Sequence, residues 1–363
     1  MHNLKEFLFE LIDLPGVTGF EDPIRERIRT EWNLAGFETN VGKTGALIAS
    51  KGLQSDGSKK SKVMIAAHMD AIGMVVRSIR GDFIQCAKAG GIDDRVIPGL
   101  PVTVYASKGR EIPEPIEGFI SLPHPKSLKP GDEEGLIPLD KMLIDVGLTN
   151  QELKEKVNIG DVVAFNTKPF ELNSKLVCGH SLDNRASVAA VTAFMHDTKE
   201  ISKDWDVYCV ATTGEEENFN GAITATYEIN PDIAIVLDVT FGKGPGSSDW
   251  QTFEVGKGIT IGYGPNLHPK LVELAKKVAD RFEIPYSMEI LPTHSGTDAY
   301  AVQIAREGIP TLLIEIPVRY MHSGSEVASL NDIERACRLV GCFITSLNVK
   351  TLEKISWEIE NES

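Results

Sequence analysis

The sequence predicts an α/β fold, a mixed and mostly parallel sheet flanked by helices, with a small β-barrel or sandwich domain inserted in the chain. Helix-like and strand-like patterns alternate over residues 1–70 and 167–363, as a layered α/β domain requires. Residues 71–166 interrupt this alternation, because they are rich in Gly and Pro and contain only short apolar runs between turns. At 363 residues, the chain exceeds the size at which one hydrophobic core usually stops growing.

The first predicted element is an amphipathic helix within residues 1–13, where Leu4, Phe7, Leu8 and Leu11 recur at helical spacing among charged residues. It lacks the uninterrupted apolar stretch of a signal peptide or a membrane span, so we expect no membrane partner and a cytoplasmic location. Further helices of the alternating domain are predicted at 21–35, 184–197, 268–283, 298–307 and 331–347.

Five apolar runs are typical of strands buried in a largely parallel sheet. Each run leads into residues that can bind a divalent metal or move a proton. In chain order these are His68 after 63–67, Asp183 after 175–182, Glu215 to Glu217 after 207–211, Asp238 after 233–237 and His322 after 311–316. Because ligands gather at the carboxyl ends of strands in open α/β sheets, the sequence predicts one site built from all five segments.

The segment 71–166 lies between two of these candidate site residues, His68 and Asp183. We therefore interpret it as an inserted β-rich domain and assign residues 1–70 and 167–363 to one catalytic domain. The alternative is a set of long loops on a single domain, which the short loops of most compact domains disfavour.

The charge and the cysteine content argue against a nucleic-acid-binding protein and against a disulfide-bonded one. The net charge is −15 and the pI about 5.1, with no long cluster of Lys or Arg, so a nucleic-acid partner has little support. Five cysteines without CxxC spacing fit free thiols in a reducing compartment. Neither a GxSxG motif nor a clustered Cys–His pair indicates covalent catalysis.

The candidate residues form a donor set suited to divalent metal ions. His68 and His322 offer imidazoles, and Asp183, Glu216 and Asp238 offer carboxylates. If these donors are divided evenly between two ions, each ion takes one imidazole and one terminal carboxylate, and the third carboxylate bridges the ions. Sites of this kind hydrolyse bonds with a water held between ions about 3.5–4 Å apart.

Two further acids have predicted roles beside this donor set. Asp70 lies two residues after His68, so in an extended segment both side chains point to the same face, and Asp70 could accept the second imidazole N–H. Glu215 and Glu216 are consecutive and point in different directions. One can therefore bind metal while the other moves a proton from water to the leaving amine.

Each residue alone also has a structural explanation. Asp183 could cap the helix that follows, and Glu215 to Glu217 could form a solvated first helical turn. A single histidine such as His322 more often completes a hydrogen-bond network than binds a metal. Their joint placement after five strand-like runs favours the metal site.

Motifs in a fixed order across almost the whole chain resemble the M42 family of metallo-aminopeptidases, which includes glutamyl aminopeptidase and the TET peptidases. The motifs are PGVTGFE at 15–21, AAHMDAIG at 66–73, SLDNR at 181–185, EE at 215–216 before GA at 221–222, LDVT at 237–240, GTDA at 296–299 and PVRYMHS at 317–323. The resemblance implies a zinc-peptidase-like fold. It also implies that Asp183 bridges two ions, Zn or Co, that His68 and Asp238 complete one metal site, and that Glu216 and His322 complete the other.

The same resemblance implies that Glu215 is the general base and that Asp70 orients His68. Family members remove amino-terminal residues from peptides. Their inserted domain mediates dimerisation, and the dimers often assemble into dodecamers, so the resemblance implies a homo-oligomer.

The chain departs from the family pattern around the site. Gly214 replaces the usual Gln before the two glutamates, Glu217 and Asn218 replace Val-Gly after them, the segment after Thr240 differs, and Ser295 replaces a Gly. These changes leave the ligand set intact. They leave open the preferred amino-terminal residue, the physiological metal and the size of the assembly.

We therefore expect a co-catalytic two-metal aminopeptidase acting on short peptides, with a metal-bridging water as nucleophile and Glu215 as general base. One alternative is a dinuclear-metal deacylase of N-acylated amino acids, which would not require a free α-amino group. Another is an endoglucanase-like glycosidase that uses two carboxylates without metal, and it leaves both histidines unused. A non-catalytic metal-bound scaffold would predict losses among the acids and ligands, and none is missing.

Overall fold

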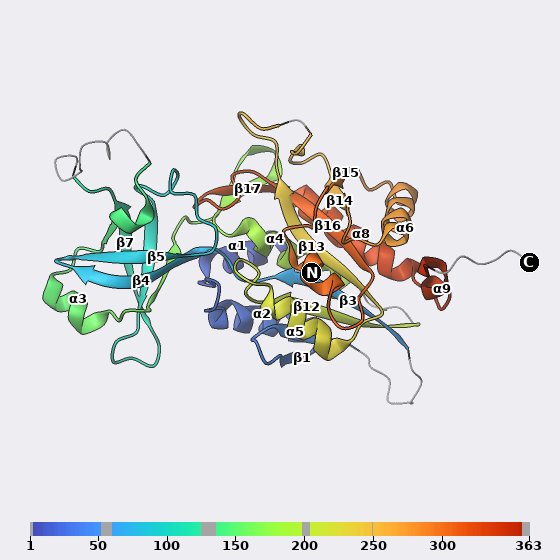
Figure 1. Cartoon of the computed structure of the whole chain (residues 1–363), viewed down its shortest axis with the longest axis horizontal. Helices are drawn as coiled ribbons and strands as arrows, with labels where there is room; N and C mark the ends of the chain where they lie inside the picture. Colours follow the sequence, from blue (N-terminus) through green and yellow to red (C-terminus); the bar gives the residue numbers. More distant parts are fainter. Residues whose placement is uncertain (1–2, 52–59, 125–135, 198–203, 249, 358–363) are drawn as a thin grey trace, which may run out of the picture.

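The computed structural model describes residues 3–51, 60–124, 136–197, 204–248 and 250–357. It contains an eight-stranded sheet covered by helices, a three-stranded sheet, and a closed barrel that projects at one end of the molecule (Figure 1). The predicted mixed α/β fold with a β barrel is therefore confirmed. Within the described ranges, no helix has both the length and the apolar character needed to cross a membrane. The five cysteines are free thiols, as predicted.

The large sheet has a parallel centre and antiparallel flanks. Its strands in spatial order are β1 (Glu38–Val41), β2 (Leu47–Ser50), β12 (Trp205–Thr212), β3 (Ser61–His68), β13 (Ile233–Phe241), β16 (Thr311–Val318), β14 (Ile259–Tyr263) and β15 (Tyr286–Ile290). The central strands β12, β3, β13 and β16 run parallel, whereas β2 and β14 pair antiparallel with this group. The carboxyl ends of the central strands consequently meet at one edge of the sheet.

The central strands form where aliphatic and β-branched residues follow one another without interruption. In β13 every residue from Ile233 to Thr240 is buried, and all of β16 is buried. Because helices cover both faces of the sheet, these strands lack the apolar and polar alternation of a half-exposed strand.

Helices cover both faces of the large sheet. On one face α4 (Leu182–Asp197) packs against α8 (Leu330–Ser346), α1 (Leu4–Asp13) and, at its edge, α2 (Asp22–Leu34), with α6 (Pro269–Arg281) beside α8. On the other face α5 (Asn220–Ile229) packs against α7 (Asp298–Gln303). Figure 1 shows this layered body on the side of the molecule opposite to the barrel.

The predicted helices correspond to α1, α2, α4, α6, α7 and α8, although the first two residues of the predicted 1–13 helix lie outside the described part. α7 ends earlier than the predicted residue 307. The chain turns at Arg306 and Gly308, which have φ of 51° and 98°, so the helix cannot continue. Among the described residues, the α-helices α3 (Asn150–Lys156), α5 and α9 (Thr351–Ile355) have no counterpart in the prediction.

One of the five strand-like runs lies outside the large sheet, so its predicted place there is wrong. The run before Asp183 forms β11 (Leu176–Gly179), which pairs antiparallel with β10 (Phe170–Glu171) and β17 (Glu326–Ser329) in the three-stranded sheet. The strand has only four residues, and one of its partners follows it by about 150 positions in the chain. Local patterning carries no information on such a distant pairing.

The barrel closes on itself in the order β4-β5-β8-β7-β6-β9. Its strands are β4 (Gly73–Arg80), β5 (Phe83–Ala89), β6 (Pro101–Ala106), β7 (Glu114–Ser121), β8 (Leu143–Asp145) and β9 (Val162–Phe165). Side chains such as Met74, Ile84, Val104 and Val163 fill its interior and form a cluster separate from the core of the large sheet. Closure of the barrel removes the exposed strand edges that an open sheet of this size would present.

Arg185 ties the amino-terminal helix to α4. Its buried guanidinium donates hydrogen bonds to the carbonyls of Leu11, Ile12 (3.2 Å) and Leu14 (2.7 Å), around the C-terminal end of α1. The last carbonyls of a helix lack donors within the helix, and the arginine supplies them. Burial lowers the pKa of Arg185 to about 10, so the side chain stays charged at neutral pH.

Arg185→Met should destabilise the protein by about 2–3 kcal/mol, because it leaves the buried carbonyls at the end of α1 without their charged donor. The midpoint of urea unfolding, followed by tryptophan fluorescence, would measure the loss. Arg95→Met is the matched control, since Arg95 is exposed and pairs with Asp93. Equal midpoints for the two variants would contradict the structural role given to Arg185.

Candidate active site

The register of the central strands places site residues side by side. Thr212, at the end of β12, pairs with His68, at the end of β3. Val236 pairs with Ala66, so Asp238 lies level with His68 on the next strand, β13. Residues at the same level of neighbouring parallel strands point to the same face of the sheet. The sheet alone therefore brings one imidazole and one carboxylate together.

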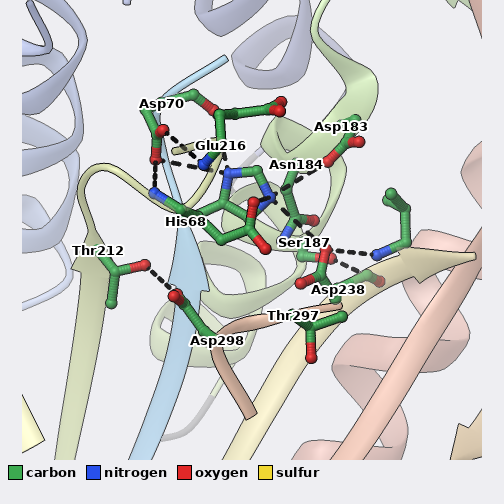
Figure 2. A network of polar contacts seen from close by, with 12 residues as sticks. His68, Asp70, Asp183, Asn184, Ser187, Thr212, Glu216, Asp238, Thr297 and Asp298 are labelled. Carbon is green, nitrogen blue, oxygen red and sulfur yellow. Dashed lines mark hydrogen bonds and ion pairs between the residues drawn. The ribbon is translucent and has the colours of Figure 1, made fainter. Parts of the chain in front are cut away.

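The other site residues arrive from segments that follow a strand. Glu215 and Glu216 come directly after β12, and His322 lies between β16 and β17. Asp183 lies in the first turn of α4, where its φ of −78° and ψ of 104° depart from helical geometry. Figure 2 shows the imidazole of His68 between Asp70 on one side and Asp183 on the other. All the predicted site residues thus meet at one edge of the sheet.

Asp183 lies between the two histidines. Its Oδ1 is 3.1 Å from Nε2 of His68, and its Oδ2 is 3.3 Å from Nε2 of His322. His68 Nε2 is also 3.6 Å from Asp238 Oδ1, and His322 Nε2 is 3.5 Å from Glu216 Oε2. The donor atoms form two groups of three, each within 4.8 Å, and both groups contain Asp183. One carboxylate is therefore shared, with one oxygen for each group.

Two buried carboxylate oxygens in these groups lack a partner. Within the described part of the chain, neither Glu216 Oε1 nor Asp238 Oδ2 accepts a hydrogen bond. Burial of an unpartnered carboxylate oxygen is costly, so such an atom normally faces a donor or a cation. Imidazole and carboxylate donors suit zinc and similar divalent ions. The residues present therefore fit a pair of metal ions.

The pKa values show that the groups hold excess negative charge. Burial, with the added charge of Asp183, raises the pKa of Glu216 to about 8. Burial raises the pKa of Glu215 to about 11, against the opposing charge of His68. The hydrogen bond to Asp183 raises the pKa of His322 to about 9. Burial opposes ionisation of Asp183, yet hydrogen bonds from His322 and His68 hold its pKa below the usual range. Cations among these groups would favour the ionised carboxylates.

Asp70 makes different contacts from those predicted. Nδ1 of His68 lies 3.1 Å from the backbone carbonyl of Asp70, whereas the Asp70 carboxylate is 3.6 Å away. The carbonyl can only accept, so Nδ1 carries the proton and Nε2 presents its lone pair to the acids. The Asp70 carboxylate instead accepts hydrogen bonds from the amides of Glu215 (3.1 Å) and Glu216 (3.2 Å). It thereby fixes the backbone of both glutamates. Figure 2 shows Asp70 beside Glu216.

Glu215 lies beside the metal-binding groups without belonging to either. Its Oε2 is 3.8 Å from Nε2 of His68, and its side chain is 10% exposed at the wall of a cavity of about 410 Å³. Gly214, directly before it, has φ of 68°, a conformation that glycine adopts at little cost. The chain turns there, immediately after β12, so that Glu215 and Glu216 lie at the site.

Two buried acids near the site have no role in the sequence prediction. Glu326, at the start of β17, accepts hydrogen bonds from the amides of Asp183 and His322, both at 2.9 Å. Asp298, at the start of α7, accepts a hydrogen bond from Thr212, and burial raises its pKa to about 7. Two features of the sequence could have indicated these acids. Glu326 lies at the start of an apolar strand, and Asp298 lies inside the GTDA motif.

Two of the departures from the family pattern make defined contacts. Glu217 accepts a hydrogen bond from the amide of Gly90 at 2.8 Å, which links the glutamate segment to the barrel. Ser295 accepts a hydrogen bond from Nδ2 of Asn266 at 3.0 Å and lines the cavity. Both residues therefore shape the cavity wall rather than the metal-binding groups.

The sequence matches a family model and known relatives over most of its length. The model described as M42 glutamyl aminopeptidase matches residues 45–339. Lysyl aminopeptidase from Pyrococcus furiosus is 33% identical over 350 residues, which cover 94% of this chain and 97% of that protein.

Solved structures of TET peptidases share the fold. The TET aminopeptidase from the marine sediment archaeon Thaumarchaeota archaeon SCGC AB-539-E09 gives a TM-score of 0.88 at 26% identity, covering 97% of this chain and 99% of that one. The TET1 peptidase from Pyrococcus horikoshii, which can assemble into a tetrahedron or a large octahedral shell, gives 0.79 at 27% identity, covering 95% and 100%. The chain therefore belongs to the M42 glutamyl aminopeptidase family, a family of peptide-hydrolysing enzymes.

Proposed function

We propose that this M42 aminopeptidase is a co-catalytic two-metal enzyme that removes the amino-terminal residue from short peptides. The observation that carries the proposal is the pair of three-residue groups that share Asp183. In this assignment His68 and Asp238 complete one metal site, and Glu216 and His322 complete the other. The unpartnered oxygens of Glu216 and Asp238 support it, because a cation at each site gives each oxygen a partner.

When bound, two ions such as Zn or Co would lower the pKa of a shared water and polarise the scissile carbonyl. Glu215 takes the proton from the attacking water and returns it to the leaving amine. Its place beside His68, outside both three-residue groups, supports this role. Asp70 acts as a positioning residue, because its carboxylate holds the amides of Glu215 and Glu216 and its carbonyl orients His68.

We also propose that residues 71–166 form an inserted dimerisation domain, with residues 1–70 and 167–363 forming the catalytic domain. The barrel exposes large apolar side chains, including Ile112 (82%), Phe119 (48%) and Ile159 (74%). Apolar surface of this kind is common where a second chain binds. Assembly of such dimers into a dodecamer, as in the solved structure of PhTET1-12s, would give a homo-oligomer of up to twelve chains.

Glu215→Gln should lower the rate of hydrolysis of an aminoacyl anilide by at least about 100-fold, because glutamine keeps the size of the side chain but cannot accept the proton. The metal content, measured by mass spectrometry, should stay at the wild-type value. Glu307→Gln makes the same change at an exposed residue between α7 and β16 and should keep most of the activity. A near-normal rate in Glu215→Gln would contradict the proposed base.

The proposed sharing of Asp183 predicts unequal losses of metal. Asp183→Ala should reduce the content from about two ions per chain to nearly none, because both sites lose a ligand. His322→Ala should keep about one ion. Metal content would be measured after dialysis, with circular dichroism as a check on folding. An equal loss of a single ion in the two variants would show that Asp183 serves only one site.

An aminopeptidase should discriminate against a blocked amino terminus, whereas a deacylase of N-acylated amino acids should not. We expect the leucyl anilide to be hydrolysed and its N-acetylated form to react at least about tenfold more slowly. Matched assays with the metal-loaded enzyme would measure both rates. Equal rates would favour the deacylase, and loss of activity on chelation with recovery on addition of Zn or Co would exclude a metal-independent glycosidase-like site.

A further inference from the structure

The cavity beside the proposed metal ligands continues across the sheet. Its lining includes Asp238 on β13, Glu315 on β16 and Glu289 on β15. Glu315 pairs in register with Asp238, and Thr260 on β14 pairs in register with Glu315. These side chains therefore lie on one face of the sheet, in a row that leads away from the metal-binding groups.

Two carboxyl groups of the cavity wall reach the same hydroxyl. The Thr260 hydroxyl lies 3.1 Å from Glu315 Oε2 and 3.4 Å from Glu289 Oε2, so both acids reach the same point. Glu315 is only 3% exposed. In the part of the chain that the structure describes, neither acid forms an ion pair with Lys or Arg. A cavity wall with buried acid and no counter-ion is poorly suited to anions and apolar groups.

A second, independent feature in the same cavity also lacks a partner. Thr240 lies two residues after Asp238 on β13, lines the cavity and is 3% exposed. Its hydroxyl has no hydrogen-bond partner among the described residues. Buried hydroxyls are normally satisfied, so this group has capacity for a donor that enters the cavity.

The remaining wall is largely apolar. Phe219, Phe241, Leu291 and Met321 also line the cavity. Lysine and arginine carry their charge at the end of a methylene stem that packs well on apolar surface. A cavity lined by both apolar and acidic side chains therefore complements a long basic side chain.

Building on the proposed function, we propose that this cavity receives the side chain of the substrate's amino-terminal residue, and that Glu289 and Glu315 select lysine or arginine there. A basic side chain gives both acids a partner. Leucine contacts the apolar residues but offers the acids no positive charge, and glutamate meets like charge. Specificity then arises from buried polar groups, which discriminate more strongly than apolar contacts do.

The test compares lysyl, arginyl, leucyl and glutamyl anilides with the metal-loaded enzyme. We expect kcat/KM for the lysyl and arginyl substrates to exceed that for the leucyl substrate by about tenfold or more, with the glutamyl substrate lowest.

Glu289→Gln should reduce the ratio of lysyl to leucyl kcat/KM by about tenfold. Glu289→Lys should reduce it further and raise the ratio of glutamyl to leucyl kcat/KM. Glu315→Gln should act in the same direction as Glu289→Gln, and the half-buried Glu289 keeps the test open if the Glu315 variant fails to fold.

Glu307→Gln is the matched control, since Glu307 is exposed between α7 and β16 and should leave the selectivity unchanged. Calorimetry provides a readout independent of turnover, because free L-lysine should bind wild-type enzyme more tightly than L-leucine and lose this advantage in Glu289→Gln. Leucyl preference in the wild-type enzyme would overturn the specificity proposal alone. Equal losses for lysyl and leucyl substrates would also overturn it, by assigning the acids to the α-amino group that both share. If no anilide is hydrolysed, the proposed function fails, and the calorimetric comparison still decides the specificity.

Discussion

A buried cluster of acids at the carboxyl edge of a sheet is the constraint on which this structure depends. Asp183, Glu215, Glu216 and Asp238 lie close together around two imidazoles, and burial opposes the ionisation of each acid. Only positive charge among them can keep the carboxylates ionised together. Without that charge, burial favours protonation of Glu215, Glu216 and Asp238. This cluster of buried acids is therefore suited to binding cations.

The surrounding structure holds these acids in place through their backbones. Asp70 accepts hydrogen bonds from the amides of both glutamates, and Glu326 accepts hydrogen bonds from the amides of Asp183 and His322. Asp70 thus fixes two consecutive residues of a distant segment, whereas Glu326 fixes the distant Asp183 and its near neighbour His322. The large sheet supplies His68 and Asp238, whereas the three-stranded sheet leads into Asp183 and contains Glu326. The site consequently depends on both sheets meeting correctly.

The sequence predicted the features that local patterns encode. Uninterrupted aliphatic runs identified β3 and β13, and helical periodicity identified α1 and α8, so the edge that gathers His68 and Asp238 could be expected. β11 was placed in the wrong sheet, because its pairing with β17 joins segments far apart in the chain. Local patterning also cannot show which atom of Asp70 lies nearer to His68, because this depends on the path of the backbone after β3: the carbonyl lies 3.1 Å from Nδ1 and the carboxylate 3.6 Å. The acid pair of the cavity wall depends on strand order, which no local pattern reveals.

The central claim is that two cations share the Asp183 carboxylate. Anomalous diffraction from crystals grown with zinc, recorded on both sides of the zinc absorption edge, tests it most directly. The account predicts two anomalous peaks about 3.5–4 Å apart, one beside each oxygen of Asp183. A single peak, or two peaks too far apart for Asp183 to contact both, would contradict it.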